Sequence, residues 1–385
     1  AAMQKCTFVL LASVAATAVP GMSLSVARAP EAAPQAVQEA SLQPVIVTAQ
    51  RRKEDMPHVP ISVASFNALE LNTLQVTTAT DLAQIVPGLS MQTFNGATLP
   101  FLRGIGLQNS GPWQESPVST YVDGVYYINP NISTVVLNNI QSVEVDKGPQ
   151  GTLFGRNAVG GVIQYETRDP RQTPEADVAV GYGNYATTSA SLYATTGITD
   201  KLAANIAIAA DDQREGWGRD LYNGAYVDTQ YSYSARSKWE LTPDKNTKLM
   251  LILDWATAQY PISEGIERGE YPFITTGPSQ VGGYYDTYLP TTPYRHYTQY
   301  GVSLTADRDL GWAKFVSISA VRRDGENKNV PYPFSPPFLP ETPAVGQLPG
   351  LKTNAAGDMF DNTGTEELRL LSPSSSAITW VGGAF

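Results

Sequence analysis

The sequence is poor in the residues on which most catalytic and metal sites depend. Among 385 residues there is one cysteine, Cys6, and there are two histidines, His58 and His296, on separate segments. Neither a disulfide framework nor a cysteine metal site can therefore be proposed. No nucleophile elbow is present either, so the sequence offers no catalytic constellation, no metal site and no reason to expect a cofactor.

Charge is also scarce. Asp, Glu, Lys and Arg make up only 16 % of the chain, whereas about a quarter is usual for soluble domains. The net charge of -10 argues against a nucleic-acid partner. Tyrosine (20) and glycine (32) are abundant instead. Low charge with many tyrosines and glycines suits a β-rich protein with an aromatic belt at a membrane interface.

The apolar run near the N-terminus, residues 7–19, is too short to cross a bilayer as a helix. It follows Lys5 and precedes small-x-small pairs that end at Ala27 and Ala29. This pattern predicts a secretory signal peptide within residues 1–29, with cleavage after Ala27 favoured because Pro30 follows Ala29. A buried helix is the alternative. Residues 30–43 are rich in Ala, Pro, Glu and Gln, which predicts a disordered tether over residues 30–55.

A glycine-rich stretch, residues 140–170, is the most structured signal in the chain. Val143 and Val145 alternate with acidic residues, and residues 162–167 alternate in the same way, so a strand is predicted on each side of the glycines. Dense glycines allow positive φ and close backbone approach. An ordinary glycine-rich turn is one interpretation. A phosphate loop is disfavoured because no Lys-Ser or Lys-Thr follows.

This stretch resembles the end of the plug domain of TonB-dependent outer-membrane receptors. Three further motifs of that family occur in the same order: TDLAQIVPGL at 80–89, LRGIG at 102–106 and YVDGV at 121–125. The resemblance implies an α+β plug domain over residues 56–170, followed by antiparallel transmembrane β-barrel strands over residues 171–385.

The pattern after residue 176 agrees with such strands. Val302, Leu304 and Ala306 alternate with polar residues, as do Val316, Ile318 and Ala320 and several similar groups. We therefore expect the apolar sets to face lipid and the polar sets to face the lumen. A soluble sandwich would also alternate, but the signal peptide and the aromatic strand ends favour a membrane barrel.

Connections of two lengths are expected at the two ends of these strands. Short turns at 197–201 and 242–246 are predicted to be periplasmic, and the long connections 214–228, 259–295 and 324–358 to be extracellular. About nine strands follow the predicted plug, whereas roughly 22 are needed to enclose one. We therefore expect the chain to be an N-terminal part of an incomplete barrel.

The resemblance also implies site residues. Residues 44–49 would be the TonB box, a segment that pairs with the periplasmic TonB protein by strand addition; on their own they read as an edge strand. Plug arginines would pair with barrel glutamates, and the motifs indicate Arg103 or Arg156 with Glu366 or Glu367. The alternative is a hydrated ion pair in the barrel lumen that contributes little to stability. The TonB box comprises Pro44, Val45, Ile46, Val47, Thr48 and Ala49.

Ligand contacts are expected on the irregular plug loops, because loops on a rigid scaffold are where ligands usually bind. Trp113 and Tyr127 would stack on a ligand, and Gln108, Asn109 and Gln114 would hydrogen-bond it. The alternative is a loop that faces solvent or the barrel wall.

The function implied is TonB-dependent active uptake of a scarce nutrient across the outer membrane of a Gram-negative bacterium, after signal-peptide export. The partners would be TonB, energised from the inner membrane, the lipid of the outer membrane and a small nutrient ligand. A ferric siderophore is the leading cargo, with cobalamin and oligosaccharides as alternatives. A passive plugged porin or a surface-binding protein is the second functional class, and a soluble enzyme is disfavoured.

Overall fold

The computed structural model describes two bodies, a small mixed domain and a large antiparallel sheet. The described residues are 46–48, 51–52, 54–55, 59–94, 97–108, 115–129, 139–221, 223–260, 283–286, 294–332 and 353–385. The predicted signal peptide lies outside them, as do Pro44, Val45 and Ala49 of the predicted TonB box. Within the described residues, no helix is long and apolar enough to cross a bilayer.

The small domain, residues 59–167, is built on a five-stranded sheet with the order β3-β9-β10-β7-β8. Its strands are β3 (Ser62–Asn67), β7 (Val118–Val122), β8 (Val125–Tyr127), β9 (Ile140–Lys147) and β10 (Gly161–Thr167). Strands β10 and β7 run parallel, and the other neighbours are antiparallel. The two strands predicted from the glycine-rich stretch are thus confirmed as the neighbours β9 and β10.

Short helices and a second sheet cover this core. They are α1 (Ala68–Thr73), η2 (Ala79–Asp81), α2 (Leu82–Ile85), α3 (Gly151–Phe154) and the sheet β4 (Leu89–Phe94), β5 (Ala97–Leu102) and β6 (Ile105–Gly106). Helix α1 starts with a reciprocal capping box, in which Asn67 and Glu70 each bind the other's backbone N–H. Mixed strands and short helices make the α+β body that the motifs predicted.

One glycine of the loop is required where β10 begins. Gly161 has φ +145°, and a Cβ there would lie 2.3 Å from the carbonyl oxygen of Asp146 on β9. No side chain fits between two backbones this close. Gly161 therefore lets β9 and β10 pair up to Lys147, which brings the acidic residues of β9 into the interior.

The large sheet, called the wall here, contains nine antiparallel strands among the described residues, in simple sequence order. They are β11 (Glu175–Gly183), β12 (Thr187–Thr199), β13 (Leu202–Gln213), β16 (Gln230–Asp244), β17 (Thr247–Tyr260), β18 (Tyr294–Asp309), β19 (Lys314–Tyr332), β20 (Thr353–Leu371) and β21 (Val381–Ala384). A small hairpin, β14 (Gly218–Arg219) with β15 (Tyr226–Val227), lies in the connection before β16. A two-stranded pair, β1 (Ile46–Val47) with β2 (Glu54–Asp55), precedes the small domain.

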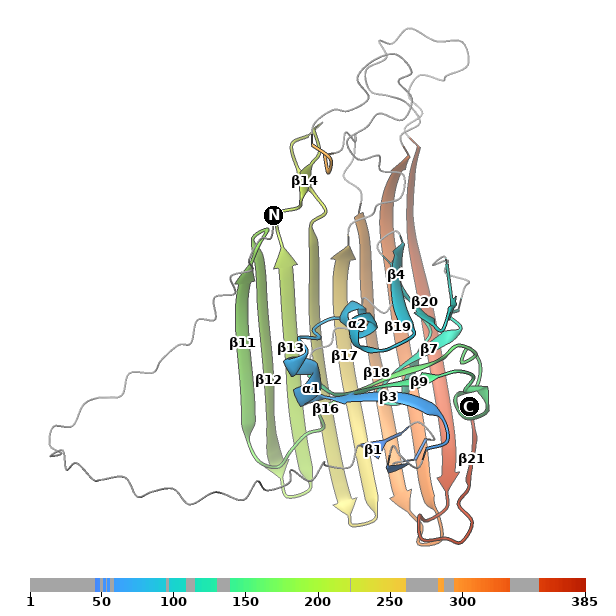
Figure 1. Cartoon of the computed structure of the whole chain (residues 1–385). Helices are drawn as coiled ribbons and strands as arrows, with labels where there is room; N and C mark the ends of the chain where they lie inside the picture. Colours follow the sequence, from blue (N-terminus) through green and yellow to red (C-terminus); the bar gives the residue numbers. More distant parts are fainter. Residues whose placement is uncertain are drawn as a thin grey trace, which may run out of the picture.

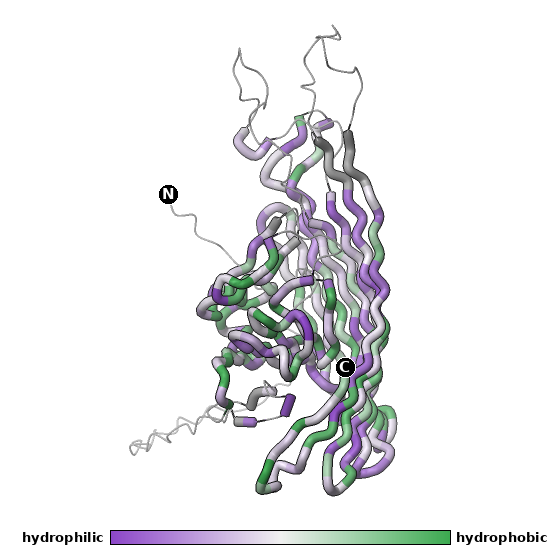
Figure 2. The backbone as a smooth tube through the Cα atoms, turned by 90° about the vertical axis from the view of Figure 1, so that its right-hand side faces the viewer, coloured by the Kyte–Doolittle hydropathy of each residue, from purple (hydrophilic) through white to green (hydrophobic). Residues whose placement is uncertain are grey.

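The small domain lies on one face of the wall, as the two views at right angles show (Figures 1 and 2). The expected orientation of side chains holds for β18, where Val302 and Leu304 are exposed on the far face. It is wrong for the apolar set of β19. Val316, Ile318 and Ala320 face the small domain and join its hydrophobic core, so this part of the inner face is dry and apolar because a packed domain, and not water, covers it.

Candidate functional site

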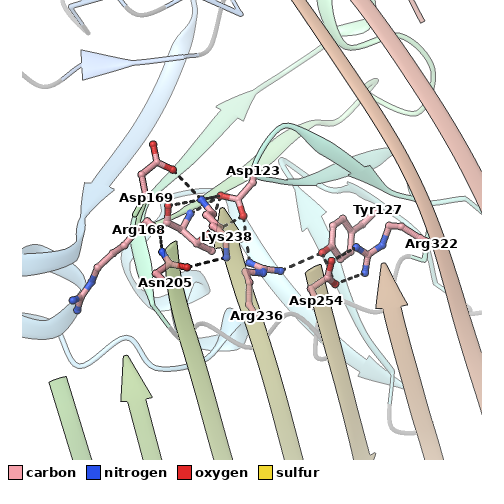
Figure 3. Close-up of polar contacts among 10 residues, drawn as sticks. Asp123, Tyr127, Arg168, Asp169, Asn205, Arg236, Lys238, Asp254 and Arg322 are labelled. Carbon is pink, nitrogen blue, oxygen red and sulfur yellow. Dashed lines mark hydrogen bonds and ion pairs between the residues drawn. The ribbon is translucent and has the colours of Figure 1, made fainter. Parts of the chain in front are cut away.

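The interface between the small domain and the wall is centred on Lys238 of β16. Its ammonium nitrogen lies 2.8 Å from a carboxylate oxygen of Asp123, 2.9 Å from the carbonyl oxygen of Thr167 and 3.1 Å from Asp169. Lys238 is only 2 % exposed. All three acceptors belong to the small domain and the segment that leaves it, so one wall cation gathers three of their oxygens (Figure 3).

The position of Asp123 follows from its local sequence. Asp123 and Gly124 both have positive φ, +50° and +80°, as the Asp-Gly pair of a tight hairpin turn requires. This turn joins β7 to β8 and points its carboxylate at the end of β10, where the N–H and hydroxyl of Thr167 also donate to it. A Cβ on Gly124 would approach Ile318 of the wall to 3.1 Å, so the turn itself sits against β19.

A second group of polar side chains surrounds Tyr127 at the end of β8. Arg322 of β19 forms two parallel 2.9 Å hydrogen bonds to Asp254 of β17, and its guanidinium carbon lies 3.7 Å above the Tyr127 ring. The Tyr127 hydroxyl donates to Asp254 at 3.4 Å and accepts from Arg236 at 3.3 Å. Burial raises the pKa of Tyr127 above its usual value, with the Asp254 carboxylate adding to the shift. The phenol therefore stays neutral, and its hydroxyl connects the plug domain to Arg236 of β16 and Asp254 of β17 (Figure 3).

At the other side of the small domain, Arg51 connects it to β20. Its guanidinium lies 4.1 Å from the ring centre of Phe154 and 4.6 Å from that of Tyr121, and 3.4 Å from the Glu367 carboxylate. The Arg51 and Glu367 side chains are 5 % and 9 % exposed. A cation sheltered between two rings and a carboxylate is strongly held, because water cannot screen either interaction.

The residues beside Arg51 are fastened as well. One nitrogen of Arg52 donates to the backbone and hydroxyl oxygens of Ser372 and to the carbonyl of Trp380, in the β20–β21 hairpin. Thr48 donates its N–H and its hydroxyl to the carboxylate of Glu144, at 2.7 and 3.0 Å. The segment with Thr48 and Arg51–Arg52, called the N-terminal clasp here, thus contacts both bodies.

Two buried acids lie beneath this clasp. Burial raises the pKa of Glu144 above its usual value, while the hydrogen bonds from Thr48 lower it. Burial raises the pKa of Asp146 to about 7, with the nearby Glu144 charge adding to the shift and the Gln164 amide opposing it. Among the described residues, one Asp146 oxygen has no hydrogen-bond partner. Asp146 therefore titrates near neutrality inside the small domain.

The predicted pairing of Arg103 with Glu367 does not appear; Glu367 meets Arg51. Arg103 lies exposed in the β5–β6 turn with φ +53°. Arg156 pairs within the small domain with Glu115, at 3.3 Å. Glu366 points away from the small domain and accepts from Ser317 of β19 at 3.0 Å. Glu366 and Glu367 face opposite sides of the wall because neighbouring residues alternate along a strand.

The predicted ligand residues fall in different places. Tyr127 is buried in the interface and not on a ligand-facing loop. Gln108 is exposed just after β6, and Asn109, Trp113 and Gln114 lie outside the described residues. Of the predicted TonB box, Ile46 and Val47 pair with β2, and Thr48 binds Glu144. No cluster of metal-ligating side chains occurs within the described part of the chain.

Sequence reasoning missed the partners that hold the interface together. Lys238 and Arg236 stand on the polar side of an alternating strand, which was a usable signal for an inward cation. Asp123 lies in the YVDGV motif, where its turn geometry alone explains an aspartate. Only the tertiary structure brings Asp123 together with Lys238 and Arg236.

Comparison with known proteins agrees with this architecture. Residues 56–162 match the family model described as the TonB-dependent Receptor Plug Domain. The small domain is a plug domain of the TonB-dependent receptor family. The plug domain is the part with the clearest sequence match, because the model covers it and ends before the wall begins.

Similar proteins are receptors and transporters, not enzymes. The chain is 32 % identical over 121 residues to a pesticin receptor of Yersinia enterocolitica, covering 31 % of this chain and 18 % of that protein. It is 26 % identical over 181 residues to the vitamin B12 transporter BtuB of Vibrio vulnificus, covering 45 % and 28 %. The chain therefore spans less than a third of the length of these relatives.

The fold of plug domain and wall together is that of solved receptors. The ferric yersiniabactin uptake receptor FyuA of Yersinia pestis aligns with a TM-score of 0.67 at 20 % identity, over 84 % of this chain and 47 % of that one. The ferripyoverdine receptor of Pseudomonas aeruginosa aligns with a TM-score of 0.65 at 12 % identity, over 87 % and 43 %. A plug domain followed by antiparallel barrel strands is thus the fold of this chain, and nine strands form an open sheet.

Proposed function

We propose that this chain supplies the plug domain and part of the barrel of an outer-membrane receptor that takes up a scarce nutrient with energy from TonB. In this proposal residues 44–49 are the TonB box, and the ligand contacts are Gln108, Asn109, Trp113 and Gln114. A ferric siderophore is the first candidate cargo, because two of the similar solved structures are receptors for ferric yersiniabactin and ferripyoverdine. Cobalamin is the second, because a similar transporter carries that name.

The observation that carries this proposal is the N-terminal clasp. Thr48, within the proposed box, binds the plug domain through Glu144. Arg51 and Arg52, just after the box, bind the wall through Glu367 and Ser372. A pull on the box would reach both bodies through these contacts, which are few and near the start of the chain. The Lys238 cluster on the far side of the plug domain would meanwhile resist displacement, because its charges are buried and paired.

The barrel wall supports a place in the outer membrane. Its far face exposes large apolar side chains, among them Leu253, Trp255, Val302 and Leu304. Such a surface in contact with water would drive aggregation, whereas lipid covers it without cost. A passive plugged porin would share this wall and differ in having no use for the box.

The test is uptake by the full-length receptor with Ile46→Pro. Proline removes a backbone N–H from the strand that TonB would pair with, so uptake of ⁵⁵Fe-loaded siderophores or of labelled cobalamin should fall to background while cargo binding persists. Ile46→Val, which keeps a β-prone residue, is the matched control. Unchanged uptake by Ile46→Pro would remove energy coupling and favour the passive porin.

A further inference from the structure

The far face of the wall contains a groove that the uptake function does not use. It has a volume of about 650 Å³ and lies between two rows of outward side chains. Strand register defines the rows. The lower row is Ile206, Ser237, Leu253, Val302 and Val321, and the upper row is Ala235, Trp255, Tyr300, Arg323 and Asn362.

The shape of the groove follows from residue size. Ala235 and Ser237 are small and leave space beside the large neighbours Trp255 and Leu253 on β17. Its lining is mostly apolar. Val321 is 68 % exposed, and its cross-strand neighbour in the lower row is Val302. A cross-strand channel of this kind fits a hydrocarbon chain better than water does.

Arg323 gives the groove a charged end. Its guanidinium carbon lies 4.6 Å above the ring of Phe360, and in the part of the chain that the structure describes no carboxylate pairs with it. The outward acids of the next strand, Asp358 and Glu366, lie in other rows, opposite Asn327 and Ser319. Asp358 accepts from Asn327, and Glu366 accepts from Ser317. Arg323 is thus an outward arginine next to Tyr300, which in turn lies next to Trp255, at the aromatic level where a barrel leaves the hydrocarbon.

We propose that this groove binds a phosphorylated, acylated glycolipid of the lipid A type, with a phosphate on Arg323 and an acyl chain along Val302 and Val321. A guanidinium is the side chain best matched to phosphate, and the apolar row below it accepts the chain. Trp255 and Tyr300 of this row lie nearer the ends of β17 and β18 that face the proposed extracellular connection than the opposite ends, so the lipid is assigned to the outer leaflet. The inference rests on the proposed membrane location and is independent of cargo.

The experiment is a native mass spectrometry titration of the delipidated full-length receptor in detergent with hexa-acylated lipid A. Arg323→Gln should bind lipid A about tenfold more weakly, as expected for loss of a charge-assisted hydrogen bond. Arg308→Gln, the same change at an exposed position of the opposite strand end, should bind like the original receptor. Ala235→Trp, which fills the groove, should weaken binding without touching the charge.

Dephosphorylated lipid A separates phosphate recognition from simple apolar contact. It should bind the original receptor and Arg323→Gln equally weakly, because the partner of Arg323 is then absent. Equal lipid A affinity of Arg323→Gln and the original receptor would overturn the proposal. So would phosphatidylglycerol binding as tightly as lipid A, since the groove would then hold general membrane phospholipid. The Arg323→Gln receptor should still be recovered in the outer-membrane fraction of cells. Failure of the proposed membrane location can then be told apart from failure of the lipid site.

Discussion

The ammonium nitrogen of Lys238 on the wall lies 2.8 Å from a carboxylate oxygen of Asp123 in the plug domain, and the two side chains are only 3 % and 6 % exposed. The pair joins residues 115 positions apart. Each partner also holds others: Asp123 accepts from Thr167, and Lys238 donates to Asp169. A buried pair with its remaining hydrogen bonds satisfied fixes how the two bodies dock, because a shift that parts the charges within the interface leaves each buried without its counter-charge.

The first prediction concerns this pair. Lys238→Met should loosen the plug domain by up to about 3 kcal/mol, since the buried Asp123 carboxylate loses its 2.8 Å ammonium partner and keeps only the longer 3.5 Å pair with Arg236. Hydrogen exchange of β7, β8 and β10 in the full-length receptor measures this as faster amide exchange. The double variant Asp123→Ala with Lys238→Met should be less perturbed than the sum of the two single variants. Lys314→Met, which removes an exposed pair with Asp307, is the control and should cost under about 1 kcal/mol. Equal exchange in Lys238→Met and Lys314→Met would contradict the prediction.

The second prediction concerns the N-terminal clasp. Arg51→Ala removes the cation from Glu367 and from the rings of Tyr121 and Phe154. Because the site is buried, the loss should be several kcal/mol, enough to release residues 46–55 from both bodies. Limited proteolysis of the full-length receptor should then cut this segment at least about tenfold faster. Arg156→Ala removes an arginine that is 61 % exposed and should leave the cutting rate unchanged; protection of the segment in Arg51→Ala would exclude the clasp.

The third prediction is a pH dependence that comes from Asp146. Burial raises its pKa from 3.8 to about 7, so between these values the folded protein holds a proton that the unfolded chain has lost. The free energy of unfolding therefore falls as pH rises from about 4 to about 7, by at most about 4 kcal/mol. Asp146→Asn cannot ionise and should raise the melting temperature at pH 8 while changing it little at pH 4.5.

Melting of the full-length receptor across this pH range tests the effect. The exposed turn residue Asp200, changed to Asn, is the control for a general loss of negative charge. A parallel shift of the Asp146→Asn curve at every pH would mean that the carboxyl does not titrate in this window.

Local sequence was sufficient for several elements of the fold. The alternation around Val143 and around residues 162–167 predicted β9 and β10, and the turn residues near 199–201 and 242–246 predicted where wall hairpins reverse. These succeed because the side-chain period of a strand and the φ demands of a turn depend on residues close in sequence. The sequence prediction named both Glu366 and Glu367 as partners of a plug arginine, although alternation lets only one of two neighbouring residues face the plug domain.

The sequence by itself determined that this chain forms a glycine-dependent α+β body and a series of alternating strands, because those depend on near neighbours. Only the tertiary structure decided that Arg51 and not Arg103 reaches Glu367, and that Val316, Ile318 and Ala320 turn toward the plug domain. Alternation assigns the residues of a strand to two faces but does not determine what covers each face. That depends on which distant surface excludes water there, and a buried charge is stable only where folding brings its counter-charge.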